Sequence, residues 1–305
     1  MMPLVSDGIW NHDSYAHGDT RMPRDLSRVA VFFLTLLIGA FAAAPAHSET
    51  EEAKPGLVFE PHKLNYFVLN SVPPNENAQV KFQISSRFQV TEWRDYRLYF
   101  AYTQKSFWNI GKTSMPFEES NYNPELFISR PMDRPIHRNL KLHDLTFGLF
   151  EHESNGLSGI DSRSWNRSYV ASSFGLESQK TLEETKPLIK HRFLMSIKLW
   201  IAYNKSSQEK YLESIGRGNE AFLDYAGWGE VRASLRDIFL PKNQVDFKTR
   251  IVPSWSHGSY EIGYHQNIST TNFFIYAQYW YGYGESLRRF AELDRRFKIG
   301  LSFFH

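Results

Sequence analysis

The sequence predicts an all-β fold, an antiparallel transmembrane β-barrel, and its composition and periodicity both support that prediction. Aromatic residues make up 16% of the 305 residues, yet the mean hydropathy is only -0.45. Outer-membrane barrels combine these properties because their strands alternate lipid-facing apolar with lumen-facing polar residues and carry aromatic girdles. Strands that cross a bilayer must close into a barrel, because open edges would leave backbone groups unpaired in hydrocarbon.

Alternation with a period of two runs through several segments of the chain. In residues 193–203 the odd positions carry Phe, Met, Ile, Leu, Ile and Tyr, whereas Lys198 lies on the other face. Residues 80–90, 260–265 and 296–303 repeat the pattern. A lysine is tolerated in such a strand only if it faces a hydrated or internally paired lumen. A soluble sandwich or lipocalin-like barrel would show the same alternation with its apolar face inward, so periodicity alone leaves that alternative open.

Residues 1–46 are predicted to be a leader and signal peptide. Arginines precede an apolar run over residues 29–44, and Ala44-Pro45-Ala46 supplies small residues for cleavage. The run is short for a membrane helix and no stop-transfer pattern follows it, which disfavours the alternative of a membrane anchor. Residues 47–305 are then expected to form one outer-membrane barrel domain, with residues 47–65 as a flexible periplasmic tail.

Cysteine content and charge exclude some classes of protein and partner. The chain contains no cysteine, so an exported fold would need no disulfide. The formal net charge is +2 and the sequence contains no basic block, which predicts no nucleic-acid partner.

Three polar residues form the candidate catalytic group. His152 and Ser154 are two residues apart, so in a strand their side chains point to the same face. A segment rich in Asn, Ser and Gly follows and would end the strand in a tight loop. If a strand from residue 164 pairs antiparallel with the first, Asn166 returns beside His152. Serine becomes a nucleophile when a base takes its proton, and Asn166 would fix the tautomer of that base.

Two runs of residues, His152 to Gly156 and Ser162 to Arg167, closely resemble the signature of the bacterial outer-membrane phospholipase A family. Tyr102–Ser106, Asn121-Tyr122 and Gly282–Leu287 resemble further family segments, in the family's order. The resemblance implies a barrel of about twelve strands in the outer membrane of a Gram-negative bacterium. It also implies calcium-dependent phospholipase A1/A2 activity by a homodimer, with membrane phospholipids and lysophospholipids as substrates.

The resemblance assigns a role to each residue of the catalytic group. Ser154 would attack the ester carbonyl and His152 would act as its base. Asn166 would orient the imidazole ring. The backbone N–H of Gly156 would stabilise the negative charge that develops on the carbonyl oxygen.

The resemblance further implies a Ca²⁺ site built from oxygen ligands, which suit this hard cation. The Leu157 carbonyl and the Ser162 hydroxyl would bind the ion, and the Ser114 carbonyl of a neighbouring subunit would complete the site. Gly159 stands where the family usually has an acidic ligand. Asp161, two residues further on, is the candidate replacement.

Gln104 is the candidate dimer-interface residue. Leu98, Phe100 and Tyr102 share its parity, so a strand that turns them to lipid turns the amide there too. A lone amide in hydrocarbon is costly, and the same residue of a second copy would relieve that cost across a two-fold axis. The family resemblance implies the same contact. The alternative is that Gln104 lies at the level of the lipid headgroups.

Three classes of function are compatible with such a barrel: a lipid acyl hydrolase, a passive outer-membrane pore, and a structural or adhesive barrel. The grouping of Ser154, His152 and Asn166 favours the hydrolase, because neither a pore nor an adhesin needs these residues at hydrogen-bonding positions.

Overall fold

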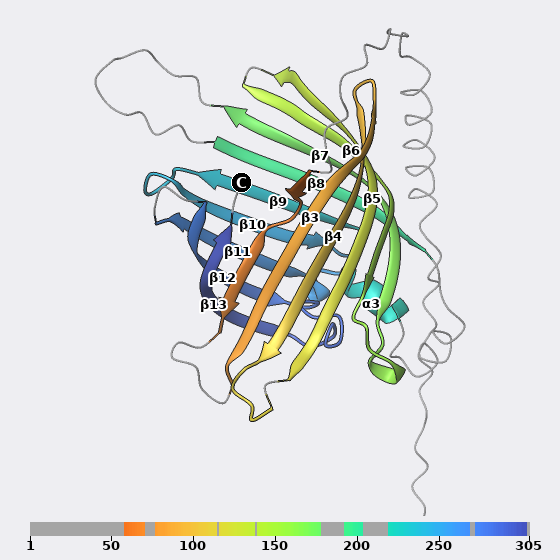
Figure 1. Cartoon of the computed structure of the whole chain (residues 1–305), viewed down its shortest axis with the longest axis vertical. Coiled ribbons are helices and arrows are strands. Elements are labelled where there is room, and N and C mark those ends of the chain that lie inside the picture. Colours follow the sequence, from red (N-terminus) through yellow and green to blue (C-terminus); the bar gives the residue numbers. More distant parts are fainter. Residues whose placement is uncertain are drawn as a thin grey trace, which may run out of the picture. The chain divides into compact units, whose positions relative to one another are not determined.

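The computed structural model describes residues 58–70, 77–114, 116–137, 139–177, 192–203, 219–268 and 272–303. Most of them lie in one antiparallel sheet of thirteen strands (Figure 1). The strands are β1 (Phe59–Pro61), β2 (Asn65–Leu69), β3 (Gln79–Trp93), β4 (Tyr96–Asn109), β5 (Phe117–His137), β6 (Leu140–Ser154), β7 (Ser164–Glu177), β8 (Arg192–Tyr203), β9 (Gly229–Arg236), β10 (Asn243–Ile251), β11 (Ser259–Asn267), β12 (Phe273–Gly282) and β13 (Asp294–Phe303). The helices are α3 (Asn219–Ala226) and the 3-10 turns η1 (Gly159–Asp161) and η2 (Trp255–His257). No helix within these ranges is long and apolar enough to cross a membrane.

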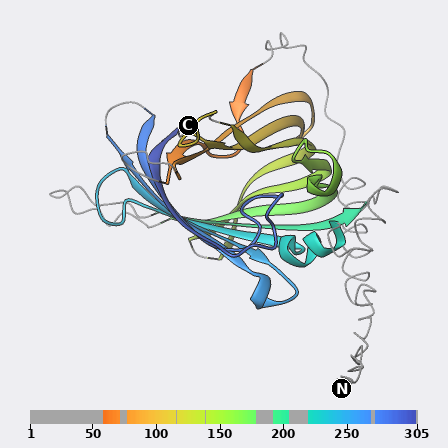
Figure 2. The same ribbon diagram turned by 90° about the horizontal axis from the view of Figure 1, so that it is seen from below.

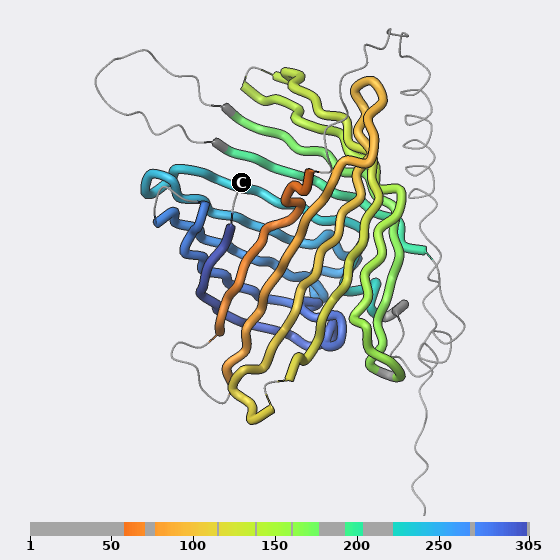
Figure 3. Tube along the Cα trace, in the orientation of Figure 1, coloured from red at the N-terminus to blue at the C-terminus, as the bar shows by residue number. Residues whose placement is uncertain are grey.

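The sheet closes on itself. β2 pairs with β3 on one side and with β13 on the other, and β3 also pairs with β4, so the first and last strands lie side by side (Figure 3). β1 and β2 both pair with β3, with Phe59 opposite Phe88 and Tyr66 opposite Gln83. They are two parts of one interrupted strand. With β3 to β13 the closed barrel therefore has twelve strands, as predicted, arranged around a common axis (Figure 2).

The periplasmic tail predicted for residues 47–65 is too long, because β1 and the start of β2 already belong to the barrel wall. Between these strands the chain turns two polar side chains toward a lumen carboxylate. His62 Nε2 lies 2.8 Å and Lys63 Nζ 2.6 Å from Glu125 Oε1. This break hides the alternation that would have marked the strand. The predicted leader and signal peptide, and residues 47–57, lie outside the described residues.

The two faces of the wall differ in polarity, and β13 shows this clearly. Phe297, Ile299 and Leu301 point outward with 60%, 39% and 42% of their surfaces exposed. Lys298 and Ser302 point inward and are 1% and 0% exposed. A soluble barrel would turn its apolar side chains inward, so the exposed apolar face decides in favour of the membrane barrel.

Several buried charges in the lumen form ion pairs. Lys81 Nζ donates to Glu285 Oε1 at 3.0 Å, and Lys298 donates to the same oxygen. Lys248 Nζ lies 3.0 Å from Glu261 Oε2. A charge away from bulk water needs such partners, since an unpaired one costs several kcal/mol or more. The lumen is therefore an internal ionic network, as the lysines of the alternating strands predicted.

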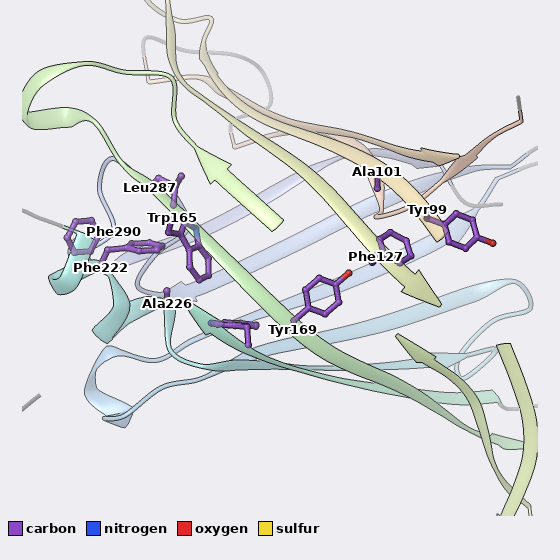
Figure 4. Packing of buried hydrophobic residues seen from close by; sticks show 10 residues of the cluster. Tyr99, Ala101, Phe127, Trp165, Tyr169, Phe222, Ala226, Leu287 and Phe290 are labelled. Atoms are coloured by element: carbon purple, nitrogen blue, oxygen red, sulfur yellow. The ribbon is translucent and has the colours of Figure 1, made fainter. Parts of the chain in front are cut away.

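An aromatic cluster joins the lumen side of the wall to two connecting segments. Phe222 of α3 contacts the rings of Trp165 on β7 and Phe290 in the β12–β13 connection, with centroid distances of 5.3 and 5.5 Å. Leu287 and Ala226 pack in the same cluster (Figure 4). Trp165 directly precedes Asn166, so this packing supports the strand that carries a candidate site residue.

Replacing Phe222 by Ala is expected to destabilise the barrel by about 3 kcal/mol, because it leaves a cavity between two aromatic rings. Urea unfolding in detergent, followed by tryptophan fluorescence, measures the change. Phe239→Ala is the control, because Phe239 is 70% exposed and its truncation should change stability little. Equal effects of the two substitutions would show that the cluster is not a packed core.

Candidate active site

The β6–β7 hairpin brings two of the three candidate catalytic residues together. The strands pair antiparallel with His152 opposite Asn166 and Ser154 opposite Ser164. The His152 Nδ1–H donates to Asn166 Oδ1 at 2.7 Å. An amide oxygen only accepts, so this contact fixes the proton on Nδ1 and leaves the Nε2 lone pair available. Asn166 therefore lies beside His152, as antiparallel pairing of the two strands predicts, whereas no hydrogen bond joins His152 to Ser154 in the described residues.

The candidate catalytic residues lie on the outer wall of the barrel. Glu151 and Arg167 point to the lumen and are buried, so the alternation turns His152, Ser154 and Asn166 outward, where each is half-buried. The ring of Phe150, also outward, lies nearly parallel to that of His152 at a centroid distance of 6.5 Å. The imidazole therefore borders the surface that faces lipid.

Ser154 ends β6 and stands between two neighbours. Tyr122 on β5 lies opposite it on one side and Ser164 on the other. Within the described residues its hydroxyl makes no hydrogen bond, so it is not yet engaged with His152. Gly156, just beyond, has a φ of 64°, and a Cβ there would come 2.8 Å from the Tyr122 ring. Only glycine suits this left-handed turn and the close approach of the ring.

Asn155 organises the loop between the two strands, a role that the sequence analysis missed. It is 2% exposed. Its Oδ1 accepts from the backbone N–H of Arg163 at 3.0 Å and of Leu157 at 3.3 Å, and its Nδ2 donates to the Asp161 carbonyl at 2.7 Å. The side-chain amide of Asn155 thus connects both ends of the loop by hydrogen bonds. The available signal was an Asn at the end of a strand, a residue type that bonds to nearby backbone groups.

The candidate calcium ligands fit the ion in chemical type. Leu157, Asp161 and Ser162 lie in the β6–β7 loop, and Ser114 lies in the connection from β4 to β5. Carbonyl, hydroxyl and carboxylate oxygens are donors that Ca²⁺ accepts. Within the described ranges no three His, Asp or Glu side chains are grouped to hold a metal ion, so a site here would combine at most two such side chains with neutral oxygens.

The single acid among these candidates already has a partner. Arg288 Nη2, from the β12–β13 connection, lies 3.0 Å from Asp161 Oδ2. Both side chains are about two-fifths exposed, 40% for Arg288 and 43% for Asp161, so this pair contributes little stability. Arg288 nevertheless competes with a metal ion for the Asp161 carboxylate. The two residues come from segments that are far apart in the chain.

Gln104 lies on the outer face, as predicted, but it is not a lone amide. Its Oε1 accepts from the Tyr102 hydroxyl at 3.3 Å, and its Nε2 donates to Ser106 Oγ at 3.2 Å. The expectation of a lone amide is therefore wrong, because two side chains of the same strand bond to Gln104. A primary amide has two donor hydrogens and two acceptor lone pairs, so half of its capacity remains for another partner.

Gln104 and Ser154 lie on one row across the wall. Gln104 is opposite Tyr122, and Tyr122 is opposite Ser154. Neighbouring strands are spaced by about 4.8 Å, so two strand intervals separate the amide from the hydroxyl by roughly 10 Å. Tyr122 is the only residue between them on this row.

A closed antiparallel barrel with an apolar exterior and a paired polar lumen defines an outer-membrane protein whose strands cross the bilayer. Within that class, the chain belongs to the phospholipase A1 family: the family model matches residues 46–303. The chain is accordingly an outer-membrane protein, and it belongs to a family of phospholipases.

Individual relatives agree with this assignment. The phospholipase A1 of Escherichia coli strain K12 is 30% identical over 251 residues, which cover 78% of this chain and 75% of the relative. The putative phospholipase A1 of Neisseria meningitidis serogroup B is 29% identical over 234 residues. That alignment covers 75% of this chain but only 55% of the relative.

Two solved structures share the fold. The outer membrane phospholipase A from Escherichia coli matches with a TM-score of 0.64 at 24% identity, over 83% of this chain and 95% of that one. The Salmonella typhi outer membrane phospholipase, a dimer with bound calcium, matches with a TM-score of 0.63 at 25% identity, over 83% and 94% of the two chains.

Asn155→Ala is expected to loosen the β6–β7 loop while leaving the barrel folded. The loss of buried hydrogen bonds costs about 1–3 kcal/mol, which corresponds to a locally open state that is roughly 5- to 150-fold more populated. Hydrogen exchange at the Leu157 and Arg163 amides measures it. Asn243→Ala is the control, because Asn243 is equally buried and accepts from the Ile238 amide in another turn. Unchanged exchange at Arg163 would contradict the role given to Asn155.

Proposed function

We propose that this chain hydrolyses acyl ester bonds of membrane phospholipids and lysophospholipids as a calcium-dependent phospholipase A1/A2. The observation that carries the proposal is the hydrogen bond from His152 Nδ1 to Asn166 Oδ1, made on the outer wall beside Ser154. A polar pair on a lipid-facing surface has a cost, which a catalytic role explains and a passive wall does not.

Ser154 is the nucleophile of the proposed reaction. Its Oγ attacks the ester carbonyl while His152 Nε2 accepts the hydroxyl proton, and the same proton then passes to the leaving lysolipid oxygen. A water molecule, deprotonated by His152, hydrolyses the acyl-enzyme and releases the fatty acid. Asn166 keeps the imidazole oriented through both steps but adds no negative charge to stabilise the imidazolium.

The negative charge on the carbonyl oxygen needs a donor and a cation. The Gly156 N–H, at the turn after the nucleophile, is the proposed backbone donor. Calcium bound by the Leu157 carbonyl and the Ser162 hydroxyl would supply positive charge beside that oxygen. Asp161 would join these ligands only by leaving Arg288, with which it is paired at 3.0 Å.

The position of the site determines how the substrate arrives. His152, Ser154 and Asn166 face outward from the wall, so a phospholipid can reach them laterally from the bilayer without entering the lumen. The predicted signal peptide fits this location, since an outer-membrane enzyme must first be exported.

A homodimer would complete the active form. Gln104 keeps a free donor and a free acceptor after its contacts with Tyr102 and Ser106, enough for a reciprocal pair with Gln104 of a second copy. Its row leads through Tyr122 to Ser154, so contact between two walls would place the second subunit, with its Ser114, near the nucleophile. This proximity supports a link between dimerisation and activity.

A passive pore is the alternative function, and the described lumen does not favour it. Side chains such as Lys81, Glu285 and Lys298 point into the lumen as mutually paired, buried groups. Ion conductance in planar bilayers is the measurement that would support a pore.

Substitution of the catalytic group is the first test of the proposed function. Ser154→Ala and His152→Ala should each lower fatty-acid release from phosphatidylcholine at least about a thousandfold, because the nucleophile or its base is lost. Asn166→Ala should lower it by roughly a hundredfold, because only the orientation of the ring is lost. A calcium chelator should abolish fatty-acid release by the wild type without unfolding the barrel.

The control for these variants is Ser172→Ala, an outward hydroxyl on β7 that donates to the Asp144 carbonyl away from the site. It should retain wild-type activity. Undiminished release by Ser154→Ala would refute the mechanism, and absence of release by folded, calcium-loaded wild type would favour the pore.

Substitution of the interface amide is the second test. Gln104→Leu should weaken the calcium-promoted dimer roughly five- to tenfold while the monomer stays folded, because the amide-to-amide contact between two lipid-facing surfaces is lost. Analytical ultracentrifugation in detergent measures this. The matched control is Gln266→Leu, because Gln266 on β11 accepts from Tyr264 at 3.1 Å just as Gln104 accepts from Tyr102. Equal dimerisation of both variants and the parent would exclude Gln104 from the interface.

A further inference from the structure

We propose that Arg167 is a positioning residue for the His152–Asn166 pair. From the lumen side of the wall, its guanidinium holds β6 against β7 at the one register in which the imidazole meets the amide. The catalytic meaning of this contact rests on the function proposed above, whereas the contact itself can be tested without any assay of activity.

Arg167 donates hydrogen bonds to both residues that flank His152 in the sequence. Its Nε donates to Glu151 Oε2 at 2.6 Å, its Nη2 donates to Glu151 Oε1, and its Nη1 donates to Glu153 Oε2 at 3.3 Å. Arg167 itself follows Asn166 in the chain. Because side chains alternate across a strand, this three-point contact lies directly behind the outward pair of His152 and Asn166.

The contact is largely shielded from water and is held by further groups; its most exposed member, Glu153, has 15% of its side-chain surface exposed. Glu151 is 0% and Arg167 8% exposed. The guanidinium lies over the Trp165 ring at 3.8 Å, and Trp165 Nε1 donates to Glu153 Oε2 at 3.1 Å. Cation–π and charge-assisted contacts gain strength away from water.

A second group fixes His152 from the next strand. Asn123 Nδ2, on β5, donates to the His152 carbonyl at 2.6 Å. The backbone of His152 is thus held from β5 through Asn123, while its neighbours are held from β7 through Arg167. The backbone of His152 is therefore fixed on both sides, and its imidazole ring faces the bilayer.

The register needs this support because the pairing is irregular immediately before it. The β6–β7 ladder shifts between Gly148 and Glu151, and regular pairing resumes with Glu151 opposite Arg167. A slip of one residue would turn His152 into the lumen and Glu151 toward lipid. The Glu151–Arg167 pair is the first contact after the irregularity, so it sets the register for His152 opposite Asn166.

The planar fork of arginine is what this position requires. Two parallel N–H donors to one carboxylate, with a third N–H to another, define distance and angle together. A lysine would keep the charge as a single point and lose that geometry. Arg167→Lys is therefore the informative substitution, since it separates geometry from charge.

The experiment compares Arg167→Lys in two backgrounds, wild type and Asn166→Ala, using the full chain in detergent micelles. Nuclear magnetic resonance of ¹⁵N-histidine-labelled protein reports the hydrogen-bonded Nδ1–H of His152. We expect Arg167→Lys to shift or broaden this signal and to lower kcat by about tenfold with KM changed less than about twofold, because the base is misaligned but lipid binding is kept. In the Asn166→Ala background the same substitution should change kcat less than about twofold, because contacting residues are coupled.

Lys298→Met is the matched control. It removes one of two lysines from a buried lumen carboxylate, Glu285, which keeps Lys81 at 3.0 Å. Glu151 likewise keeps Lys198 at 2.7 Å when Arg167 is changed. The control should leave the His152 signal in place, which separates the positioning of His152 from a general disturbance of the ionic network in the lumen.

Equal effects of Arg167→Lys on kcat in both backgrounds would overturn the proposal, as would an unchanged His152 signal in the folded variant. If Arg167→Lys does not fold, Glu151→Gln replaces it: an amide oxygen accepts from Arg167 but the amide nitrogen does not, so the two parallel bonds cannot both form, and this variant must shift the His152 signal or the proposal fails. If wild type releases no fatty acid, the proposed function fails, and the His152 signal alone decides the role of Arg167.

Discussion

Closure of the sheet is the constraint on which the rest of the structure depends. Hydrocarbon offers no hydrogen-bond partner, so each backbone group of a spanning strand must pair with a neighbouring strand. The pairing of β2 with both β3 and β13 removes the last open edge. Once the wall is closed, a side chain points either into the lumen or out of the barrel. Every polar side chain then needs a hydrogen-bond partner, either in the lumen or locally on the outer face.

The outer polar groups show how this constraint shapes the site. Gln104 bonds to Tyr102 and Ser106, and His152 bonds to Asn166, each within the same wall. A site built on paired strands is stiffer than one built on loops, because neighbouring ladders fix its backbone. The lumen adds to this stiffness through Arg167 and its two carboxylates, so the chemistry faces lipid while its support lies on the opposite face.

The β12–β13 connection links distant parts of the chain to the same region. Glu119 of β5 accepts from the backbone N–H of Leu287 at 2.8 Å and from the Ser286 hydroxyl. Leu287 packs in the aromatic cluster, and Arg288 reaches Asp161 in the β6–β7 loop. A segment near the end of the chain thereby contacts the loop proposed to hold calcium.

The sequence by itself determined the features that depend on local periodicity. Alternation in β8 and β13 predicted membrane strands with a polar inner face, and the spacing of His152 and Ser154 with a later Asn166 predicted one shared face. These predictions succeeded because the strand period of two fixes side-chain direction without knowledge of any partner. The loop ending the first strand followed equally from local turn chemistry.

Only the tertiary structure decided which groups meet across the chain. Four features depend on strand register or on contacts between remote segments. They are the interruption between β1 and β2, the partners of Gln104, the pairing of Asp161 with Arg288, and the hydrogen bonds from Arg167 to Glu151 and Glu153. A sequence shows that a polar residue faces lipid or lumen, but its partner is set by how the strands are staggered. Stagger arises from closure of the whole barrel, which no short segment encodes.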